Sequence, residues 1–487
     1  MAAVEPKYAL PSRRHFSESV IPTLHAKVKY QVCELLGSTS YISVTTDIWS
    51  SAYSHHSFMS LTAHFVVSAS MEKKNIMLSA WKFDESHTAD NIGASILSHA
   101  QSWEIEQKLV CVLRDNAANM IAGMRVANIP SLPCLAHTLQ LIIKDGVLLQ
   151  PAVQQLLSCG RTIVGHYHRS NVAFQTFKNV QQQLDLPDHC LIQDVTTRWN
   201  SSYYMLERLI EQKRAITVAN TECQPPTELR AQQWQLAEKV VHLLKIFEEA
   251  TRESSGDYAS ASVIIPIINT LKQALVVEED DRGIMAMKRG MLASLEQRYG
   301  DVEQNSLCAL ATIIDPRFKV KCFSSAANAS HARMLLITEC ENYLTRSVAA
   351  SQEDQPRSKH ARIDSDSSSS SLWSLFGEML DEADEANSEG INSGHTAEMM
   401  VELYLKECIQ PRHTDPLQYW KSKKIIWLPL ADLACKYLSI PPSSAASERL
   451  FSSAADVISQ ERNRLLPEKA EMLLFLKKNM PVLEFQY

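Results

Sequence analysis

The sequence lacks the features of a secreted, membrane-spanning or zinc-dependent protein. None of its 487 residues form an apolar run long enough to span a bilayer, and residues 1–7 lack the apolar stretch of a signal peptide. The 11 cysteines are scattered, odd in number and without a Cys-x-x-Cys pair. This pattern argues against a disulfide framework and contains no zinc-finger motif. We therefore expect reduced, mostly buried thiols in the cytosol or nucleus, no zinc site and no membrane partner.

Excess positive charge is also absent. The chain has 48 lysines and arginines against 55 acidic residues, a formal net charge of -7. The chain as a whole is therefore no polycation, and any DNA contact must come from local basic patches or from a segment outside it. The length allows about two or three domains with a sizeable core, and no internal repeat is present.

The first 135 residues predict an α/β layer. Helical spacing of apolar residues marks two segments, at 18–36 and 90–103. Strand patterns mark four others, at 41–48, 58–67, 76–83 and 109–113. The first three strands follow one another through short polar turns, as in an antiparallel meander, and the fourth is apolar throughout, as in a central strand covered on both faces. In the first strand, alternation separates Ile42 and Val44 from Ser43, Thr45 and Asp47.

Apolar residues three and four apart continue from about 135 to 345, which predicts an inserted all-helical domain. The clearest helices are expected at 139–147, 153–168, 234–251 and 285–299. Residues 350–397 are rich in serine and acid, a composition typical of disorder. The apolar residues between Leu372 and Leu380 suit a short partner-binding helix or a segment that packs on its own protein. We place the domains at 1–40, 41–135, 136–349, 350–397 and 398–487.

Two aspartates follow predicted strands. Asp47 ends the first strand, and Asp115 comes just after the apolar strand at 109–113. If these strands are parallel neighbours, their spacing of ~4.8 Å brings the carboxylates side by side. Like charges that close need a cation or a proton, and a divalent metal with oxygen ligands can support phosphodiester cleavage. A strand-end aspartate is also common as a turn former or helix cap, so both interpretations stay open.

A third acid, Glu448, lies in the sequence Pro-Pro-Ser-Ser-Ala-Ala-Ser-Glu-Arg. The prolines end the preceding structure, and Ser443 or Ser444 can cap a new helix. Glu448 then falls in the first helical turn, where the helix dipole favours a carboxylate. A simple capping acid beside Arg449 explains the same pattern.

Six separate blocks carry a family resemblance. They are YISVTTDIWS (41–50), LRDNAANM (113–120), CLAHTLQL (134–141), TRWNSSYY (197–204), DPLQYW (415–420) and the segment 441–480. In content and order they resemble the hAT superfamily of DNA transposases, especially its domesticated, BED-finger-containing branch. The resemblance implies an RNase H-like α/β core with a mixed sheet, interrupted by a large all-helical insertion and completed by C-terminal dimerisation helices. It also implies that Asp47, Asp115 and Glu448 are the catalytic and metal-binding triad, with Mg²⁺ or Mn²⁺ as cofactor if the chain is active.

The resemblance further implies DNA contacts at three residues. His137, in the pattern Cys134-x-x-His, matches a histidine near transposon-end DNA, although a packed cysteine with a hydrogen-bonding histidine explains the pattern as well. Trp199 matches a tryptophan that stacks on an unpaired base, an interaction worth roughly 1–3 kcal/mol; the alternative is a core tryptophan. Arg198 would pair with a DNA phosphate or form a structural salt bridge.

The C-terminal segment resembles the family's dimerisation region. Pro467 suits the first turn of a helix, and residues 472–476 make that helix apolar nearly all round. Such a helix packs in its own core or against a second copy of the chain. Relatives usually begin with a BED zinc finger, so the chain is expected to be either truncated or independent of a zinc module of its own.

These features favour a nuclear homodimer that binds DNA and chromatin or transcription proteins and regulates transcription. An active, metal-dependent transposase is the alternative, because all three acids are present. A SUMO-ligase-like regulator is a third hypothesis that depends on family analogy alone.

Overall fold

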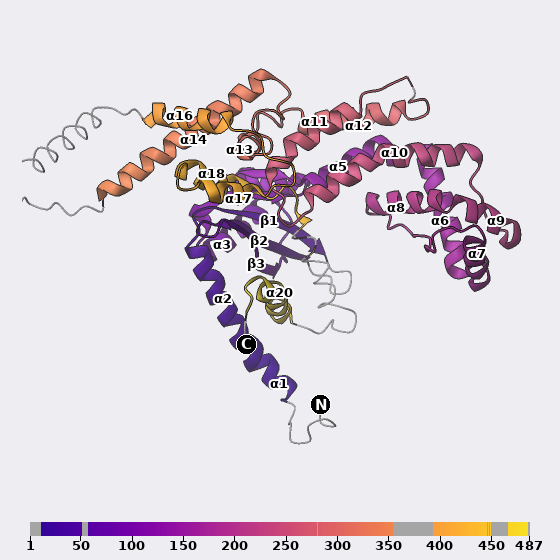
Figure 1. Cartoon of the computed structure of the whole chain (residues 1–487). Helices are drawn as coiled ribbons and strands as arrows, with labels where there is room; N and C mark the ends of the chain where they lie inside the picture. Colours follow the sequence, from indigo (N-terminus) through magenta and orange to yellow (C-terminus); the bar gives the residue numbers. More distant parts are fainter. Residues whose placement is uncertain are drawn as a thin grey trace, which may run out of the picture.

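A five-stranded mixed sheet forms the centre of the chain, and a long arm of helices extends from it (Figure 1). The computed structural model describes residues 11–50, 57–279, 281–353, 393–445, 447, 449 and 466–485. The strands are β1 (Ile42–Ser50), β2 (Ser57–Val67), β3 (Glu72–Lys82), β4 (Leu109–Arg114) and β5 (Ser131–Pro133). Their order is β3-β2-β1-β4-β5; the first three pair antiparallel, while β4 and β5 run parallel to β1. The predicted meander and mixed α/β sheet are confirmed.

One face of the sheet is apolar and is covered by helices from the N-terminal part and the C-terminus. Ile42 and Val44 of β1 join Leu61 of β2 in this core. The covering helices are α2 (Ile21–Gly37), α3 (Ala89–Ser102), α4 (Ala118–Val126) and α20 (Pro467–Val482). The helices predicted over 18–36 and 90–103 correspond to α2 and α3, with a short π-helical turn at Phe16–Val20 before α2.

The other face of β1 and β2 is polar yet buried. Opposite residues in an antiparallel ladder share a face, and the ladder pairs Ser43 with His64, Thr45 with Thr62, and Asp47 with Ser60. All of these except Asp47 are at most 6 % exposed. The alternation predicted for β1 is therefore confirmed, and it continues across β2.

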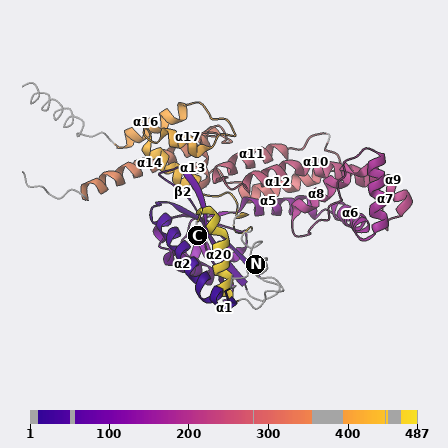
Figure 2. The ribbon, with the colours of Figure 1, turned by 60° about the horizontal axis from the view of Figure 1, so that its bottom comes forward.

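The helical arm lies between β5 and the C-terminal helices in the sequence (Figures 1 and 2). From residue 135 to 353 the described residues form helices joined by loops and contain no strand. The longer helices are α5 (Leu135–Ile143), α6 (Pro151–Arg169), α7 (Asn171–Gln183), α8 (Trp199–Glu211), α9 (Lys213–Cys223), α10 (Ala231–Ser254), α11 (Ile264–Ala274), α12 (Met285–Tyr299), α13 (Ser306–Ile314) and α14 (Ala326–Glu353). The four helices predicted from apolar spacing correspond to α5, α6, α10 and α12.

The C-terminal helices return to the sheet and to the base of the arm. They are α16 (Ser393–Lys406), α17 (Pro416–Lys423), α18 (Leu428–Leu438) and α20. Trp420 is fully buried, and its indole N–H donates to the carbonyl of Ile314 at 3.0 Å. The predicted disordered segment falls mostly on residues 354–392, which lie outside the described residues together with its apolar stretch at Leu372–Leu380.

The helix α20 closes the open edge of the sheet. Asn479 accepts from the N–H of Met77 at 3.0 Å and donates to the carbonyl of Met77 at 2.8 Å, and Glu471 accepts from the N–H of Ala80. These side chains satisfy backbone groups of β3 that an edge strand otherwise leaves unpaired. Leu474 and Phe475 are at most 3 % exposed in the same core. The apolar helix predicted around 472–476 thus packs within its own chain, starting at Pro467 as expected.

All 11 cysteines belong to the described residues and are free thiols, as expected. Five are buried and three are exposed, so the prediction that most would be buried is only partly right. Burial raises the pKa of the Cys308 and Cys435 thiols to about 12. Within the described ranges, every helix is too short or too polar to cross a bilayer.

Candidate acidic site and nucleic-acid interface

The parallel pair β1–β4 brings Asp47 and Asp115 to the same end of the sheet. The last residues paired between these strands are Thr45 and Leu113, and each aspartate follows two residues later in the sequence, Asp47 within β1 and Asp115 just after β4. Adjacent strands are ~4.8 Å apart. The predicted condition for neighbouring carboxylates, two parallel strands side by side, is therefore met.

Local hydrogen bonds orient both aspartates. Asp115 Oδ1 accepts from the N–H of Ala117 at 3.0 Å, and Asp47 Oδ1 accepts from the N–H of Ile48 at 2.9 Å. The guanidinium of Arg114 donates to the carbonyl of Asp115 at 3.0 Å, and burial lowers the pKa of this arginine. Asp115 is thus a turn former, as one interpretation proposed, yet its Oδ2 has no hydrogen-bond partner among the described residues and is available as a ligand.

The side chains at this site carry the type of oxygen atom that binds a hard divalent cation. Carboxylate oxygens are the ligands that Mg²⁺ prefers, and the ladder places Ser60 opposite Asp47 with a buried hydroxyl that has no hydrogen-bond partner. No group of three or more histidine, cysteine or acidic side chains suited to a metal occurs in the described part of the chain. Glu448, the third predicted ligand, lies outside the described residues. The described part of the chain thus supplies two of the three predicted carboxylates.

A chain of hydrogen bonds ties the sequence neighbour of Glu448 to the strand that carries Asp47. Ser447 Oγ donates to Thr45 Oγ1 at 2.9 Å, and Thr45 Oγ1 lies 3.0 Å from His64 Nε2. His64 Nδ1 lies 2.7 Å from the side-chain oxygen of Asn75, whose amide donates to the carbonyl of Asp257. Because an amide oxygen only accepts, His64 Nδ1 carries the proton and Nε2 accepts from Thr45. We call this chain the serine-447 relay.

Sequence reasoning missed the members of this relay on β2 and β3. The available signal was the polar alternation Ser60, Thr62 and His64 within an otherwise apolar strand. Linking these residues to Asn75 required the register of β2 against β3, which pairs His64 with Asn75.

The segment before Ser447 is fixed between the sheet and the helical arm. The Ser444 N–H donates to Cys134 Sγ at 3.2 Å, and Ser443 Oγ donates to the carbonyl of Ser254 at 2.8 Å. The Leu135 N–H donates to the carbonyl of Pro442 at 2.9 Å. These contacts join β5, the start of α5, the end of α10 and the C-terminal segment at one place.

The Cys-x-x-His pattern forms a helix cap. Cys134 is the N-cap of α5, and its sulfur accepts from the N–H of His137 at 3.5 Å while also accepting from Ser444. Cys134 is fully buried, in agreement with a packed cysteine. His137 is half-buried on the first turn of α5, and its DNA contact stays a prediction.

A further set of hydrogen bonds links the acidic site to the predicted DNA-binding residues. The amide of Asn116 donates to Thr138 Oγ1 at 2.8 Å, and the amide of Gln140 donates to the carbonyl of Thr197 at 2.8 Å. Thr138 follows His137, and Thr197 precedes Arg198. A continuous path therefore runs from the loop of Asp115 along α5 to the start of α8. The side chain of Arg198 is exposed and has no ion pair among the described residues, so the salt-bridge alternative is not seen there.

Trp199 does not face solvent in this conformation. It is 2 % exposed at the first position of α8 and contacts Tyr203 edge to face. The preceding loop is held by Asp194, which receives a bidentate pair from Arg161 at 2.8–3.1 Å. Burial alone would raise the pKa of Asp194, but its hydrogen bonds from Arg161 and Ser202 outweigh burial and lower it. The core alternative matches this conformation, and base stacking would require the indole to turn outward.

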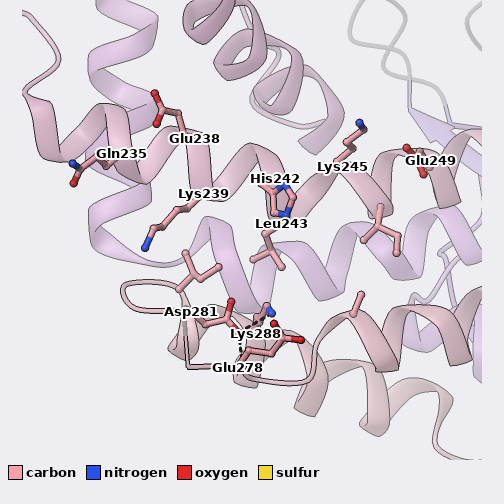
Figure 3. A pocket seen from close by; sticks show the side chains of 13 residues that line it. Gln235, Glu238, Lys239, His242, Leu243, Lys245, Glu249, Glu278, Asp281 and Lys288 are labelled. Carbon is pink, nitrogen blue, oxygen red and sulfur yellow. Dashed lines mark hydrogen bonds and ion pairs between the residues drawn. The ribbon is translucent and has the colours of Figure 1, made fainter.

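A cavity of about 970 Å³ lies away from these residues, between α10 and the loop that leads into α12 (Figure 3). Its walls alternate in charge. Lys288 pairs with Asp281 at 2.7 Å, and Lys239 donates to the carbonyl of Arg282 at 2.5 Å. Because cations and acids are interleaved, the cavity favours no single class of ligand.

Comparison with known proteins identifies the family. The hAT family C-terminal dimerisation region matches residues 400–480, the ZBED1 RNase-like domain matches 45–128, and the ZBED1 RNase-like helical domain matches 132–243. Zinc finger BED domain-containing protein 4 of Homo sapiens is 31 % identical over 497 residues, which cover 99 % of this chain and 41 % of that protein.

Two further relatives are more distant. The putative transcriptional regulator tpeD of Talaromyces stipitatus is 24 % identical over 91 % of this chain and 54 % of its own length. The putative AC transposase of Zea mays is 25 % identical over 90 % of this chain and 56 % of its own length. The chain thus spans about half the length of the curated relatives it matches. Its RNase-like and dimerisation regions place the chain in the hAT superfamily of transposase-derived proteins, beside the zinc finger BED domain-containing members.

Proposed function

We propose that this chain is a domesticated hAT protein that binds DNA in the nucleus as a homodimer and acts in transcription regulation. The observation that carries DNA binding is the path from the loop of Asp115 along α5 to the exposed Arg198. This path offers a duplex one surface shared by the sheet and the helical arm. The name of the Talaromyces relative, a putative transcriptional regulator, agrees with a regulatory role.

DNA cleavage by the same chain is the second candidate. It is favoured by the parallel strand ends that carry Asp47 and Asp115, and by the attachment of Ser447 to β1. A bound divalent metal would supply a Lewis acid and an activated water. Asp115 would offer the metal its second carboxylate oxygen, and the hydrogen bond from Ala117 would keep that oxygen oriented. The SUMO-ligase alternative gains no support from these contacts.

One experiment separates the two candidates. The purified chain is incubated with Mn²⁺ or Mg²⁺ and labelled duplex DNA that carries the terminal repeats of its own locus, and both binding and nicking are measured. Asp47→Asn, Asp115→Asn and Glu448→Gln are compared with Glu85→Gln, a change on an exposed loop. Binding without metal-dependent nicking supports the regulator, and nicking lost only in the three acid variants supports the transposase. Absence of binding by the wild type contradicts both.

The homodimer contact needs a surface other than the buried side of α20. Within the region 400–480 that matches the family's dimerisation region, Ile425 is 97 % exposed, Ile426 67 % and Leu428 47 %. Ile425 and Ile426 lie between α17 and α18, and Leu428 is the first residue of α18; we call these three residues the isoleucine turn. Contiguous exposed apolar side chains are typical of protein interfaces. We place the contact with a second copy of the chain at this turn.

Point substitutions test the dimer better than truncation does. Removing everything after Trp427 would delete α18 and α20, whose side chains fill both apolar cores. The change Ile425→Asp/Ile426→Asp should convert the dimer to a monomer in light scattering, because each charge would be buried at the contact. Leu466→Asp, which alters a residue 62 % exposed in the same region, is the control. A monomeric wild type, or dissociation only by Leu466→Asp, would contradict this placement.

A further inference from the structure

A second cavity opens where β2, β3 and α20 meet the loop at 255–259. Its volume is about 400 Å³, and we call it the β3 cavity. Four basic residues line it, together with one acidic side chain, that of Asp257; they are Lys73, Lys74, Arg449 and Lys478. No other cavity described above has such an excess of cations, so this one favours an anionic ligand.

Two of the four cations, Lys73 and Lys478, have no ion pair among the described residues, whereas Arg449 pairs with Asp257 and Lys74 lies 3.6 Å from Glu72. Lys73 is 8 % exposed and donates to the carbonyls of Ala259 at 2.6 Å and Leu438 at 3.4 Å. Burial lowers the pKa of Lys73 to about 7. Burial also lowers the pKa of Lys478, and the positive charges of Lys477 and Arg449 lower it further. An anion in the cavity would relieve this repulsion.

The cavity also contains a buried hydroxyl without a partner. Thr62 lines the cavity and is 6 % exposed, and its Oγ1 makes no hydrogen bond. A buried polar atom of this kind costs about 1–3 kcal/mol when unsatisfied. A phosphate oxygen placed beside this hydroxyl would supply the missing acceptor.

An exposed aromatic ring stands beside the cations. Tyr258 is 83 % exposed and lines both the β3 cavity and a neighbouring cavity of about 490 Å³, whose lining includes three arginines and three acidic residues. An exposed tyrosine at the rim of a cavity with excess cations is suited to stacking on a nucleic-acid base, whose phosphates the cations can contact. A small anion has no base on which this ring could stack, so the ring favours a nucleic acid as the ligand.

The cavity lies on the same sheet as the candidate acids, nearer the start of β1 than the end that carries Asp47. The ladder places Thr62 opposite Thr45, two residues before Asp47. Arg449 directly follows Glu448 in the sequence. The strand β3 is two strands from β1, about 10 Å across the sheet, and the register sets Asn75 beside His64 and Ser43, four residues before Asp47. A DNA strand at the acids would therefore run back along the sheet to enter the β3 cavity.

We infer that the β3 cavity binds the phosphates of a DNA strand that passes the candidate acidic site, while Tyr258 stacks on one of its bases. This inference rests on the DNA binding proposed above and adds the place where a strand next to the acids is held. Lys74 and Lys478 would contact phosphates, and the Thr62 hydroxyl would donate to a phosphate oxygen.

Salt-dependent DNA binding tests the phosphate contacts. The anisotropy of a labelled single strand of about 16 nucleotides is measured over a salt series for the wild type and for Lys74→Glu/Lys478→Glu. Each lost phosphate contact should reduce the slope of log K against log salt by about 0.7. Lys27→Glu, at an exposed lysine on α2, is the matched control and should leave the slope unchanged. Thermal unfolding of each variant verifies that it folds.

Substitution of Tyr258 tests stacking. Tyr258→Ala should weaken binding about 5- to 150-fold, while Tyr258→Phe should bind like the wild type because the ring is kept. Equal slopes for Lys74→Glu/Lys478→Glu and Lys27→Glu would overturn the inference while leaving the proposed function intact. So would displacement of the DNA by inorganic phosphate at equal phosphate concentration, since the cavity would then serve a small anion. A wild type that binds no DNA would overturn both.

Discussion

Acid should weaken the serine-447 relay through His64. This side chain is 2 % exposed, and burial lowers its pKa to about 3. The unfolded chain has a histidine pKa of about 6.5, so between pH 6.5 and pH 3 the unfolded state binds the extra proton and the folded state does not. The stability of the fold that depends on neutral His64 is therefore fully present above pH 6.5 and is lost as the pH falls through this window.

The size of the effect follows from the two pKa values. At pH 5, which is 1.5 units below 6.5, the loss is about 2 kcal/mol, at about 1.4 kcal/mol per unit. A proton on His64 Nε2 would also face Thr45, which now donates to that atom. The threonine hydrogen would lose its acceptor, and the link from Ser447 to β1 would weaken.

Urea unfolding at pH 7 and pH 5 measures the effect, with tryptophan fluorescence as the signal. The stability lost by the wild type between the two pH values should exceed the loss in His64→Gln by about 2 kcal/mol. His242→Gln, at an exposed histidine on α10, should lose as much as the wild type. If His64→Gln and the wild type show the same pH dependence, the folded-state pKa of His64 is not depressed and the reasoning is wrong.

Three further changes test how the fold is held together, each by the free energy of unfolding in urea. Asn479→Leu should cost about 2–4 kcal/mol, because both backbone groups of Met77 lose their partner; an unchanged stability would mean that water replaces the amide. Asp194→Asn should cost about 1–3 kcal/mol, since its arginine partner on α6 loses a buried carboxylate, and a loss equal to that of an exposed Asp188→Asn would contradict this. Gly146→Ala should cost about 1–3 kcal/mol, because a Cβ there would lie 2.7 Å from the backbone nitrogen of Met291 in α12. An unchanged stability would show that α12 can shift.

The sequence predicted the features that depend on local periodicity. Alternation in β1 separated Val44 from Thr45, and the apolar run before Asp115 indicated a central strand; both agree with the register of β1 and β4. The sequence could not predict features that depend on strand register or on which surface a helix packs against. β5 has only three residues, too few for a period to be recognised. A helix that is apolar nearly all round, such as α20, does not reveal whether it packs on its own chain or on another.

The candidate site was predicted less completely, for the same physical reason. The positions of Asp47 and Asp115 follow from strand ends, which local patterns indicate. The relay through His64 joins three strands to a distant segment of the chain, with Ser447 and Thr45 separated by 402 positions. The family resemblance implied a DNA contact for Trp199, with a core position as the alternative, and its burial depends on the packing of α8 against the rest of the arm.

The contacts around Ser443 and Ser447 have a consequence for any DNA bound across the sheet and the arm. The C-terminal segment is hydrogen-bonded to Thr45 on β1, to Cys134 at the start of α5 and to the end of α10. A rotation of the arm against the sheet would break buried hydrogen bonds at all three places, each of which costs about 1–3 kcal/mol when left unsatisfied. The arm and the sheet therefore move together, so DNA held at Arg198 would meet Asp115 at a fixed separation without a prior closing motion. Such a preformed interface loses little conformational entropy on binding, which favours affinity.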